Sequence, residues 1–455
     1  MASLPKEPSQ RTLEEDRSTM SQDMESYLSA FKEFENALNG QSQKPVHGLR
    51  TSAIERFETL GFPNTRDEDW IHTNVGPLTK VVFDPAADIT AGDLASPIPD
   101  LDCPTLVFVN GRHSADLSTP GDSLPNSITV TSINQAIESE NQQILGHLAQ
   151  HAEYDENTFT ALNTAFINDG ALIHVPRGTV VESPIHLLFV SRGTQTVSHP
   201  RVLLVAEDNA RVTVIETYVG EGDYFTNSVT ELVAGDNTVV DHYKLGLEDP
   251  RAYHIAAMQT TQGASSNVST HSISLGGLLV RNEVSAKLNG EGCEATVNGF
   301  YLLEESQHLD NHTLIEHAKP NCTSHELYKG ILGGSSQGVF RGRIHVHQIA
   351  QKTDAYQTNQ NLLLSEDADV NTKPQLEIYA DDVKCSHGAT IGQLDEHAIF
   401  YLRARGITHE NAQQLLVHAF ANDIINRVEV EPVRNHLDAI VMSKFEKLRK
   451  TELIR

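Results

Sequence analysis

The sequence predicts a mainly β protein whose core is a stacked solenoid or a sandwich, with helical regions at both ends. Short β-branched runs, separated by Gly, Asp and Asn, follow one another from about residue 103 to residue 383. The turns at residues 206–212 and 234–240 match at an offset of 28 residues. Many short strands at similar spacing are typical of both architectures. Helical spacing of apolar residues marks the chain on either side of this core.

The first part of the chain divides into a predicted disordered leader, residues 1–20, and an N-terminal helical region, residues 21–100. The leader is polar and charged and lacks the apolar segment of a signal peptide. Two helices are expected after it, the first ending near Gly40 and the second at Gly61. Their apolar faces are spaced at three and four residues, and consist of Tyr27, Phe31, Phe34 and Leu38 in the first helix and Ala53, Ile54 and Phe57 in the second.

The predicted β core spans residues 101–395 and contains one helix, at about residues 132–151. Ser132 and Gln135 have the spacing of a capping box at the start of that helix. In a parallel β-helix each coil buries alternate side chains against its neighbours, so the end coils must be capped or paired with another protein. The terminal helices of this chain are candidates for the caps.

A C-terminal helical domain is predicted at residues 396–455. Asp395 is placed to cap a helix over residues 396–405, and Gly406 is placed to end it. Two further apolar stripes follow, formed by Leu416, Phe420 and Ile424, and then by Leu437, Ile440, Val441, Phe445 and Leu448. Such stripes are more often part of a core or a cap than a docking surface.

Composition and charge exclude several classes of function. The chain has 455 residues and a formal net charge of -27, so we expect no binding to nucleic acid or to anionic membranes. No segment approaches the roughly 20 apolar residues that span a bilayer. The four cysteines are scattered, which argues against a disulfide framework and predicts a reducing, cytoplasmic setting. Phosphate-binding loops and nucleophile elbows are absent, so any ATPase must come from a partner.

Histidines and carboxylates cluster in the second half of the chain. His345 and His347 would share one face of a strand, where they could hold a metal, although cross-strand polar ladders are the commoner explanation. A mononuclear metal enzyme is therefore one alternative. Another is a β-solenoid enzyme acting on polysaccharides with paired carboxylates, for which Asp310, Glu316 and Asp354 are candidates. The single Trp and the missing secretion signal count against that alternative.

Cys385 and His387 form the sharpest chemical motif. On an extended segment their thiol and imidazole lie on one side, and the neighbouring Lys384 is expected to favour the thiolate. Thiolate and imidazole suit iron, zinc or sulfane sulfur. Closed sites usually need four ligands, so this pair is half a site that a second chain must complete, or it is a buried Cys beside a hydrogen-bonded His. Cys103, Cys293 and Cys322 are expected to be buried structural thiols.

A long series of segments resembles the SufB/SufD family of iron–sulfur cluster assembly proteins, and its SufD branch in particular. Residues 67–70 (DEDW) resemble a signature of this family near the N-terminus. The other segments that carry the resemblance are residues 316–320, 322–324, 326–330, 342–346, 351–358, 361–365, 372–378, 380–394 and 400–407. The similarity extends from about residue 50 to the C-terminus and is far more specific than any short motif.

The resemblance implies a right-handed parallel β-helix flanked by helical domains, in a non-catalytic scaffold subunit. It implies pairing with SufB through the β-helix and docking of the SufC ATPase on the C-terminal helical domain, where we single out Phe400, Tyr401, Leu402, Arg403, Arg405, Leu416 and Phe420. It further implies a nascent, transient iron–sulfur cluster at the SufB–SufD interface, with no cofactor held stably by this chain alone. His387 would be a shared metal ligand there and Cys385 its neighbour. ATP binding to SufC would then open the interface.

Overall fold

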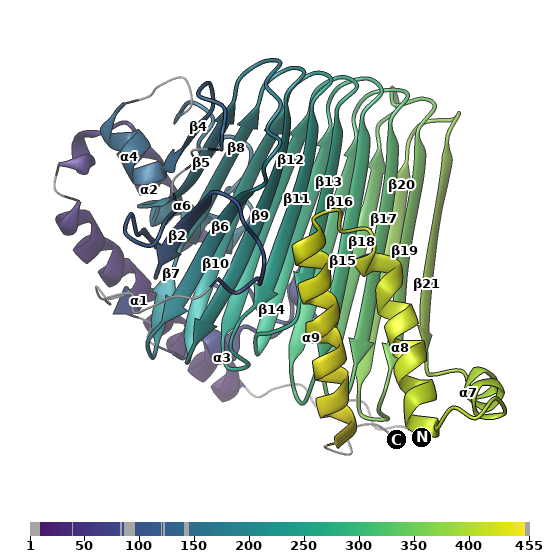
Figure 1. Ribbon diagram of the computed structural model, residues 1–455. Coiled ribbons are helices and arrows are strands. Elements are labelled where there is room, and N and C mark those ends of the chain that lie inside the picture. Colours follow the sequence, from purple (N-terminus) through teal and green to yellow (C-terminus); the bar gives the residue numbers. More distant parts are fainter. Residues whose placement is uncertain are drawn as a thin grey trace.

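Two long parallel sheets form the body of the molecule. The computed structural model describes residues 10–38, 40–81, 84–85, 96–119, 121, 123–140 and 145–450. Successive strands of the core alternate between the sheets, so the chain winds as a parallel β-solenoid (Figure 1). Sheet A contains β1 (Asp84–Pro85), β4 (Thr129–Ser132), β5 (Gly170–Val175), β7 (Thr196–Ser198), β8 (Arg201–Ala206), β10 (Tyr224–Ala234), β12 (Tyr253–Gln262), β14 (Leu279–Leu288), β16 (His308–His317), β18 (Gln337–Val346) and β20 (Asp369–Ile378).

Sheet B contains β2 (Thr105–Val109), β3 (Arg112–His113), β6 (Ile185–Arg192), β9 (Arg211–Glu221), β11 (Val239–Leu247), β13 (Asn267–Ser274), β15 (Glu294–Leu303), β17 (Thr323–Leu332), β19 (Asp354–Leu363) and β21 (Lys384–Gly392). The predicted parallel β-helix is therefore confirmed, and the sandwich alternative is wrong. The main apolar core lies between the two sheets, where inward side chains such as Val214, Met258 and Ile344 stack from coil to coil.

The repeated turn seen in the sequence forms a corner of the solenoid in successive coils. Val212 and Val240 are paired in register on β9 and β11, as the 28-residue offset predicts. The six coils that contain β9 to β19 each have one residue with positive φ two positions before the sheet B strand, and its N–H donates to a carbonyl of the next coil. These residues are Asn209, Asn237, Ser265, Gly292, Asn321 and Lys352.

The residue after each of these corner residues points inward and forms a second regular column. Its members, from Ala210 to Thr353, are all small. Several close the corner by donating to the carbonyl three residues earlier: Ser266 to Gly263 at 2.7 Å, and Thr353 to Ala350 at 2.9 Å. Cys293 and Cys322 are the two thiol-bearing members of this column, which we call the corner column.

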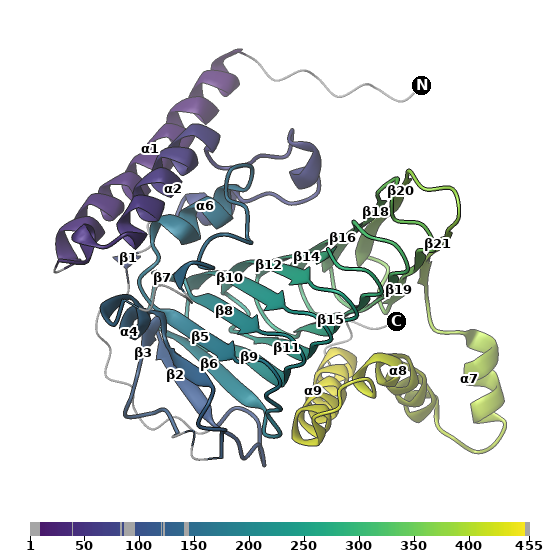
Figure 2. The ribbon, with the colours of Figure 1, turned by 90° about the horizontal axis from the view of Figure 1, so that it is seen from above.

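Helices cover the outer faces of the two sheets in different places. On sheet A they are α1 (Gln10–Ala37), α2 (Val46–Leu60) and α6 (Thr158–Ala165), which pack over the early strands through Phe225 and Ile255. On sheet B they are α8 (His409–Ile425) and α9 (Glu431–Lys450), whose apolar faces bury residues such as Leu245 and Phe300 (Figure 2). The predicted stripes of the C-terminal helices therefore serve as core.

The remaining helices are short: η1 (Gln41–Gln43), η2 (Glu68–Trp70), α3 (Gly76–Thr79), α4 (Ile133–Glu138) and α7 (Glu396–Arg403). Gly61 ends α2 and Asp395 caps α7, both as predicted, and Asp395 accepts from the backbone N–H of His397. None of the helices in the described ranges is both long and apolar enough to cross a membrane.

Two expectations for the first half of the chain need correction. Helix α1 begins at Gln10, so residues 10–20 of the predicted disordered leader are helical, and residues 1–9 lie outside the described residues. Good helix formers in this segment extend the amphipathic helix backwards. The helix predicted at residues 132–151 begins correctly but ends at Glu138. Ser132 caps it, whereas the Gln135 side chain bonds to Thr131, so only half of the capping box forms.

Candidate functional site

The last coil of the solenoid leaves its edges open. Strand β20 pairs only with β18, and β21 pairs only with β19, so each sheet ends in a strand with one unpaired edge (Figure 1). Almost every residue of β21 is exposed. Edge strands of this kind present free N–H and C=O groups to a further strand. The C-terminal end of the solenoid therefore has unpaired strand edges in both sheets.

Cys385 and His387 lie on this terminal strand and share its inner face. Cys385 is in register with the buried Ala355, and His387 with the buried Gln357, one coil below. Cys385 is half-buried against the solenoid core, whereas His387 is exposed. In the interior of a long solenoid both side chains would be covered by the next coil. Among the described residues no further coil follows, so a thiol and an imidazole lie at the open end of the solenoid.

The pKa of the Cys385 thiol differs from what the neighbouring residues in the sequence predicted. Burial, together with the negative charge of Asp354, raises the pKa of Cys385 above its usual value. Lys384 points to the opposite face of the strand and does not offset these effects. The expectation that Lys384 would favour the thiolate is therefore wrong for the isolated chain. A bound metal ion would still displace the proton, because metals bind the thiolate form.

The layer beneath His387 contains two polar residues that sequence reasoning missed. Gln357 and Glu326 occupy the same register column as His387, each one coil deeper. The Gln357 amide donates to the Glu326 carboxylate at 2.7 Å, and both side chains are buried. Burial raises the pKa of Glu326 to about 7. Strand alternation could have predicted that both point inward, but only the register places them beneath His387.

His345 and His347 lie on the outer face of sheet A, on the same side of β18 as predicted. Each bonds to a different carboxylate: His345 to Glu377 at 3.0 Å, and His347 to Glu316 at 2.7 Å. No group of three or more ligating side chains in the described residues could hold a metal ion. The geometry therefore favours the polar cross-strand ladder over a mononuclear metal enzyme.

The three carboxylates considered for glycoside hydrolysis do not converge. Asp310 is buried on sheet A, where it is paired with Arg281 and accepts from the Thr73 hydroxyl at 2.6 Å. Glu316 lies further along the same strand, and Asp354 begins β19 of sheet B. The arrangement offers no facing acid and base across a sugar-binding groove.

The residues considered for SufC docking are split between two environments. Phe400 and Tyr401 on α7 are strongly exposed, at 73% and 56%, and the Arg405 guanidinium lies 3.5 Å from the centre of the Tyr401 ring. Leu402 is half-buried, and Arg403 is exposed beside them. On α8, Leu416 and Phe420 are half-buried, and Phe420 packs towards sheet B. Among these residues the exposed aromatic rings lie on α7, which projects beside the terminal coil (Figure 2).

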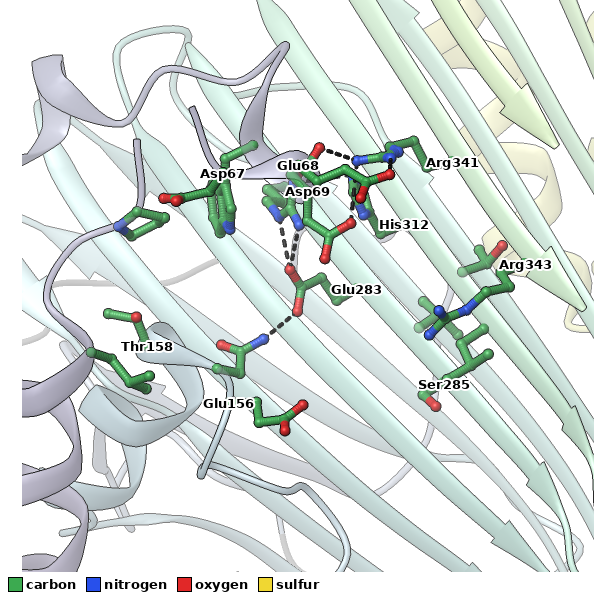
Figure 3. Close-up of a pocket in the computed structure, with 18 of the residues that line it drawn as sticks. Asp67, Glu68, Asp69, Glu156, Thr158, Glu283, Ser285, His312, Arg341 and Arg343 are labelled. Atoms are coloured by element: carbon green, nitrogen blue, oxygen red, sulfur yellow. Dashed lines mark hydrogen bonds and ion pairs between the residues drawn. The ribbon is translucent and has the colours of Figure 1, made fainter. Parts of the chain in front are cut away.

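A pocket of about 550 Å³ separates the N-terminal region from the outer face of sheet A, and the DEDW segment forms one of its walls (Figure 3). Several of its charges are paired. Glu68 accepts from Arg341 and Lys373 at 3.2 Å across the seam, while Glu283 pairs with Arg281 of the same strand at 2.6 Å. This arrangement attaches the N-terminal region to the solenoid.

Comparison with known protein families agrees with this architecture. Residues 189–420 match the family described as "SUF system FeS cluster assembly, SufBD core domain", and residues 21–187 match "SufBD protein N-terminal region". The chain belongs to the SufB/SufD family. Within this family it is 34% identical to an iron–sulfur cluster assembly SufBD family protein of Synechocystis, over 90% of this chain and 93% of that protein.

Two further SufB/SufD relatives carry the name SufD. The Escherichia coli protein is 33% identical over 84% of this chain and 89% of its own length. The Bacillus subtilis protein is 27% identical over 92% of this chain and 99% of its own length. These similarities support the SufD branch. Both are described as iron–sulfur cluster assembly proteins, so the resemblance seen in the sequence motifs is confirmed.

Proposed function

We propose that this SufB/SufD family protein is a non-catalytic scaffold subunit that pairs with SufB and contributes Cys385 and His387 to a shared site. The observation that supports the proposal is an incomplete ligand pair on the inner face of an unpaired terminal coil. A SufB strand added to β21 would cover this face and bring further ligands. Iron and sulfide would meet there as the nascent cluster, which is the cargo of the complex. The complex would work in the cytoplasm, as the scattered cysteines predict.

The pairing is tested by a charged substitution at the open edge. Ile391 points inward on β21 and is 47% exposed, so Ile391→Lys places a charge where a partner strand would pack. We expect this variant to lose SufB in affinity co-purification. Val180→Lys is the matched control, because Val180 has the same exposed fraction but pairs with Arg211 near the other end of the solenoid. Equal recovery of SufB with both variants would contradict the proposed interface.

The shared site is tested by His387→Ala in the assembled complex. This chain is proposed to supply only two ligands to the shared site, so the loss of one imidazole should strongly reduce cluster formation. Visible absorption and iron and sulfide content measure the cluster. Ser386→Ala is the control, because Ser386 is on the same strand but points to the other face. Recovery of the complex must be unchanged in both variants, so that a lost interface is distinguished from a lost ligand.

We also propose that SufC docks on α7, where exposed aromatic rings are otherwise unpartnered by the solenoid. Phe400→Asp should abolish co-purification of SufC while SufB is retained, since buried aromatic anchors dominate such interfaces. Ile349→Asp is the control, because Ile349 is also strongly exposed but lies in the turn after β18. Retention of SufC by the Phe400→Asp variant would contradict docking on α7.

A further inference from the structure

Two thiols lie next to each other in the corner column. Cys293 immediately precedes β15 and Cys322 immediately precedes β17, and the N–H of Thr323 donates to the carbonyl of Cys293 at 2.9 Å. The two cysteines therefore occupy equivalent positions in consecutive coils. Neighbouring positions of parallel strands have Cα atoms within the range that a disulfide can bridge.

Both sulfur atoms contact the same backbone carbonyl oxygen. The Cys293 thiol lies 3.1 Å from the carbonyl oxygen of Gly290, and the Cys322 thiol lies 3.3 Å from the same oxygen. The hydrogen bond between the two thiols lowers the pKa of Cys293 and raises that of Cys322, so loss of one proton from the pair is favoured at Cys293.

The other members of the corner column show that a thiol is not required at this position. Ser266 and Thr353 place a hydroxyl in the same role, donating to the carbonyl three residues earlier. A thiol is not needed to close the corner, because a hydroxyl does so in neighbouring coils. Both side chains are fully buried, and the Cys293 thiol lies 3.0 Å from the carbonyl oxygen of Gly263 and 3.1 Å from that of Gly290. Both glycines are partly exposed, so the corner lies close to the protein surface.

We propose that Cys293 and Cys322 are a site of reversible oxidation, at which a disulfide joins two consecutive coils. With hydrogen peroxide the Cys293 thiolate attacks one oxygen, the O–O bond breaks, and the leaving hydroxide is protonated to water. The Cys322 sulfur then attacks the resulting sulfenic acid, an S–S bond forms, the S–O bond breaks, and hydroxide leaves with the Cys322 proton as a second water. Two thiols lose two electrons, which the peroxide gains.

The disulfide would cross-link the solenoid below its open end. The corner column continues through Thr353 to Val383, which directly precedes β21. Cross-linking the coils that begin β15 and β17 restricts the unfolded chain by closing a long loop, and so stabilises the folded solenoid. This inference concerns residues outside the proposed SufB interface and does not depend on cluster assembly.

The experiment uses the full chain with Cys103→Ser and Cys385→Ser, which leaves only the two corner thiols. After treatment with hydrogen peroxide and removal of the oxidant, we expect the thiol count under denaturing conditions to fall from two to zero. Digestion without reductant should give one cross-linked peptide pair, which dithiothreitol separates, and the oxidised protein should stay monomeric on a non-reducing gel. Its melting temperature should exceed that of the reduced protein.

The matched control adds Cys293→Ser to this background, because Ser keeps the hydrogen bond of the corner, as Ser266 does. We expect it to fold, to form no intrachain cross-link and to gain no stability from peroxide. Persistence of both thiols in the parent protein, or oxidation to sulfinic acid without a cross-linked peptide, would overturn the proposal. Cross-linked peptide that appears only when peroxide is added to denatured protein would overturn it as well.

Discussion

The guanidinium of Arg281 lies 3.8 Å from the centre of the Trp70 ring, which joins the N-terminal region to the outer face of the solenoid. Arg281 is almost fully buried and is also paired with Asp310 and Glu283. The backbone carbonyl of Asp69 accepts from the same guanidinium at 2.9 Å. The DEDW segment therefore contacts the solenoid through the buried Arg281, in addition to the bonds of Glu68 with Arg341 and Lys373.

Trp70→Ala should loosen this attachment. A desolvated cation–π contact contributes about 2 kcal/mol, and the substitution also removes the ring that packs on the Arg281 guanidinium. We expect a lower melting temperature and faster amide exchange in α2, with the solenoid strands still protected. Trp70→Phe retains a ring and should lose much less stability than Trp70→Ala. Equal losses in the two variants would show that the ring does not carry the attachment.

The Glu326 carboxyl predicts a pH-dependent stability. Burial raises its pKa in the folded protein to about 7, above the value in the unfolded chain. The neutral carboxyl is the form that the fold accommodates, so its contribution is fully present below about pH 4.5 and is lost as the pH rises through about 7. The difference is on the order of 3 kcal/mol.

Glu326→Gln should remove this dependence, because the amide stays neutral at every pH. We expect the variant to gain stability over the wild type as the pH rises from 5 to 8, measured by chemical denaturation at each pH. Glu305→Gln is the control, since Glu305 is exposed at a turn and its loss should shift the whole profile little. Parallel pH profiles for wild type and Glu326→Gln would contradict the assignment.

The corner residues show how far the sequence could predict the fold. Asn209 and Asn237 have the same positive φ and the same residue type, so two coils were recognisable as a repeat. The later coils place Ser265, Gly292, Asn321 and Lys352 at that position, with the same backbone conformation but, except for Asn321, different side chains. The physical requirement is a left-handed backbone and one N–H donor, which several residue types meet. The repeat therefore fades in the sequence while the geometry continues.

The candidate site could also be predicted only in part, because the sequence reveals strand alternation but not the contacts between strands. Strand alternation placed Cys385 and His387 on one face, but it could not say that β21 is the last strand of its sheet. The thiolate prediction failed because sequence neighbours such as Lys384 point away, while Asp354 approaches from the adjacent strand. Contacts between strands come from the register, which depends on loop lengths that the sequence does not reveal directly.

The buried pair of Arg201 and Glu231 should be far more sensitive than any surface pair. Glu231 accepts two bonds from Arg201, the shorter at 2.7 Å, and three more from the backbone N–H groups of Ala149, His151 and Ala152. Glu231→Ala leaves a buried guanidinium without its counter-charge, which typically costs about 3–5 kcal/mol. We expect a large drop in melting temperature and rapid amide exchange at residues 149–152.

The control for this pair is Arg177→Ala at the nearby ion pair with Asp208. Arg177 is 71% exposed, so its loss should cost less than about 1 kcal/mol. A loss of stability in Arg177→Ala as large as that in Glu231→Ala would contradict the assignment of the buried pair as the anchor of residues 149–152.

Asn237 tests whether the corner conformation itself stabilises the solenoid. Its φ of 55° is unfavourable for residues with a Cβ other than Asn or Asp, and its N–H donates to Ala264 in the next coil at 2.8 Å. Asn237→Ala should therefore cost about 1 kcal/mol, whereas Asn237→Gly keeps the conformation without strain. The exposed side chain offers little packing in either case. Melting temperatures decide between the two causes: a loss confined to Asn237→Ala identifies backbone strain, while equal losses would show that the Asn side chain holds the corner.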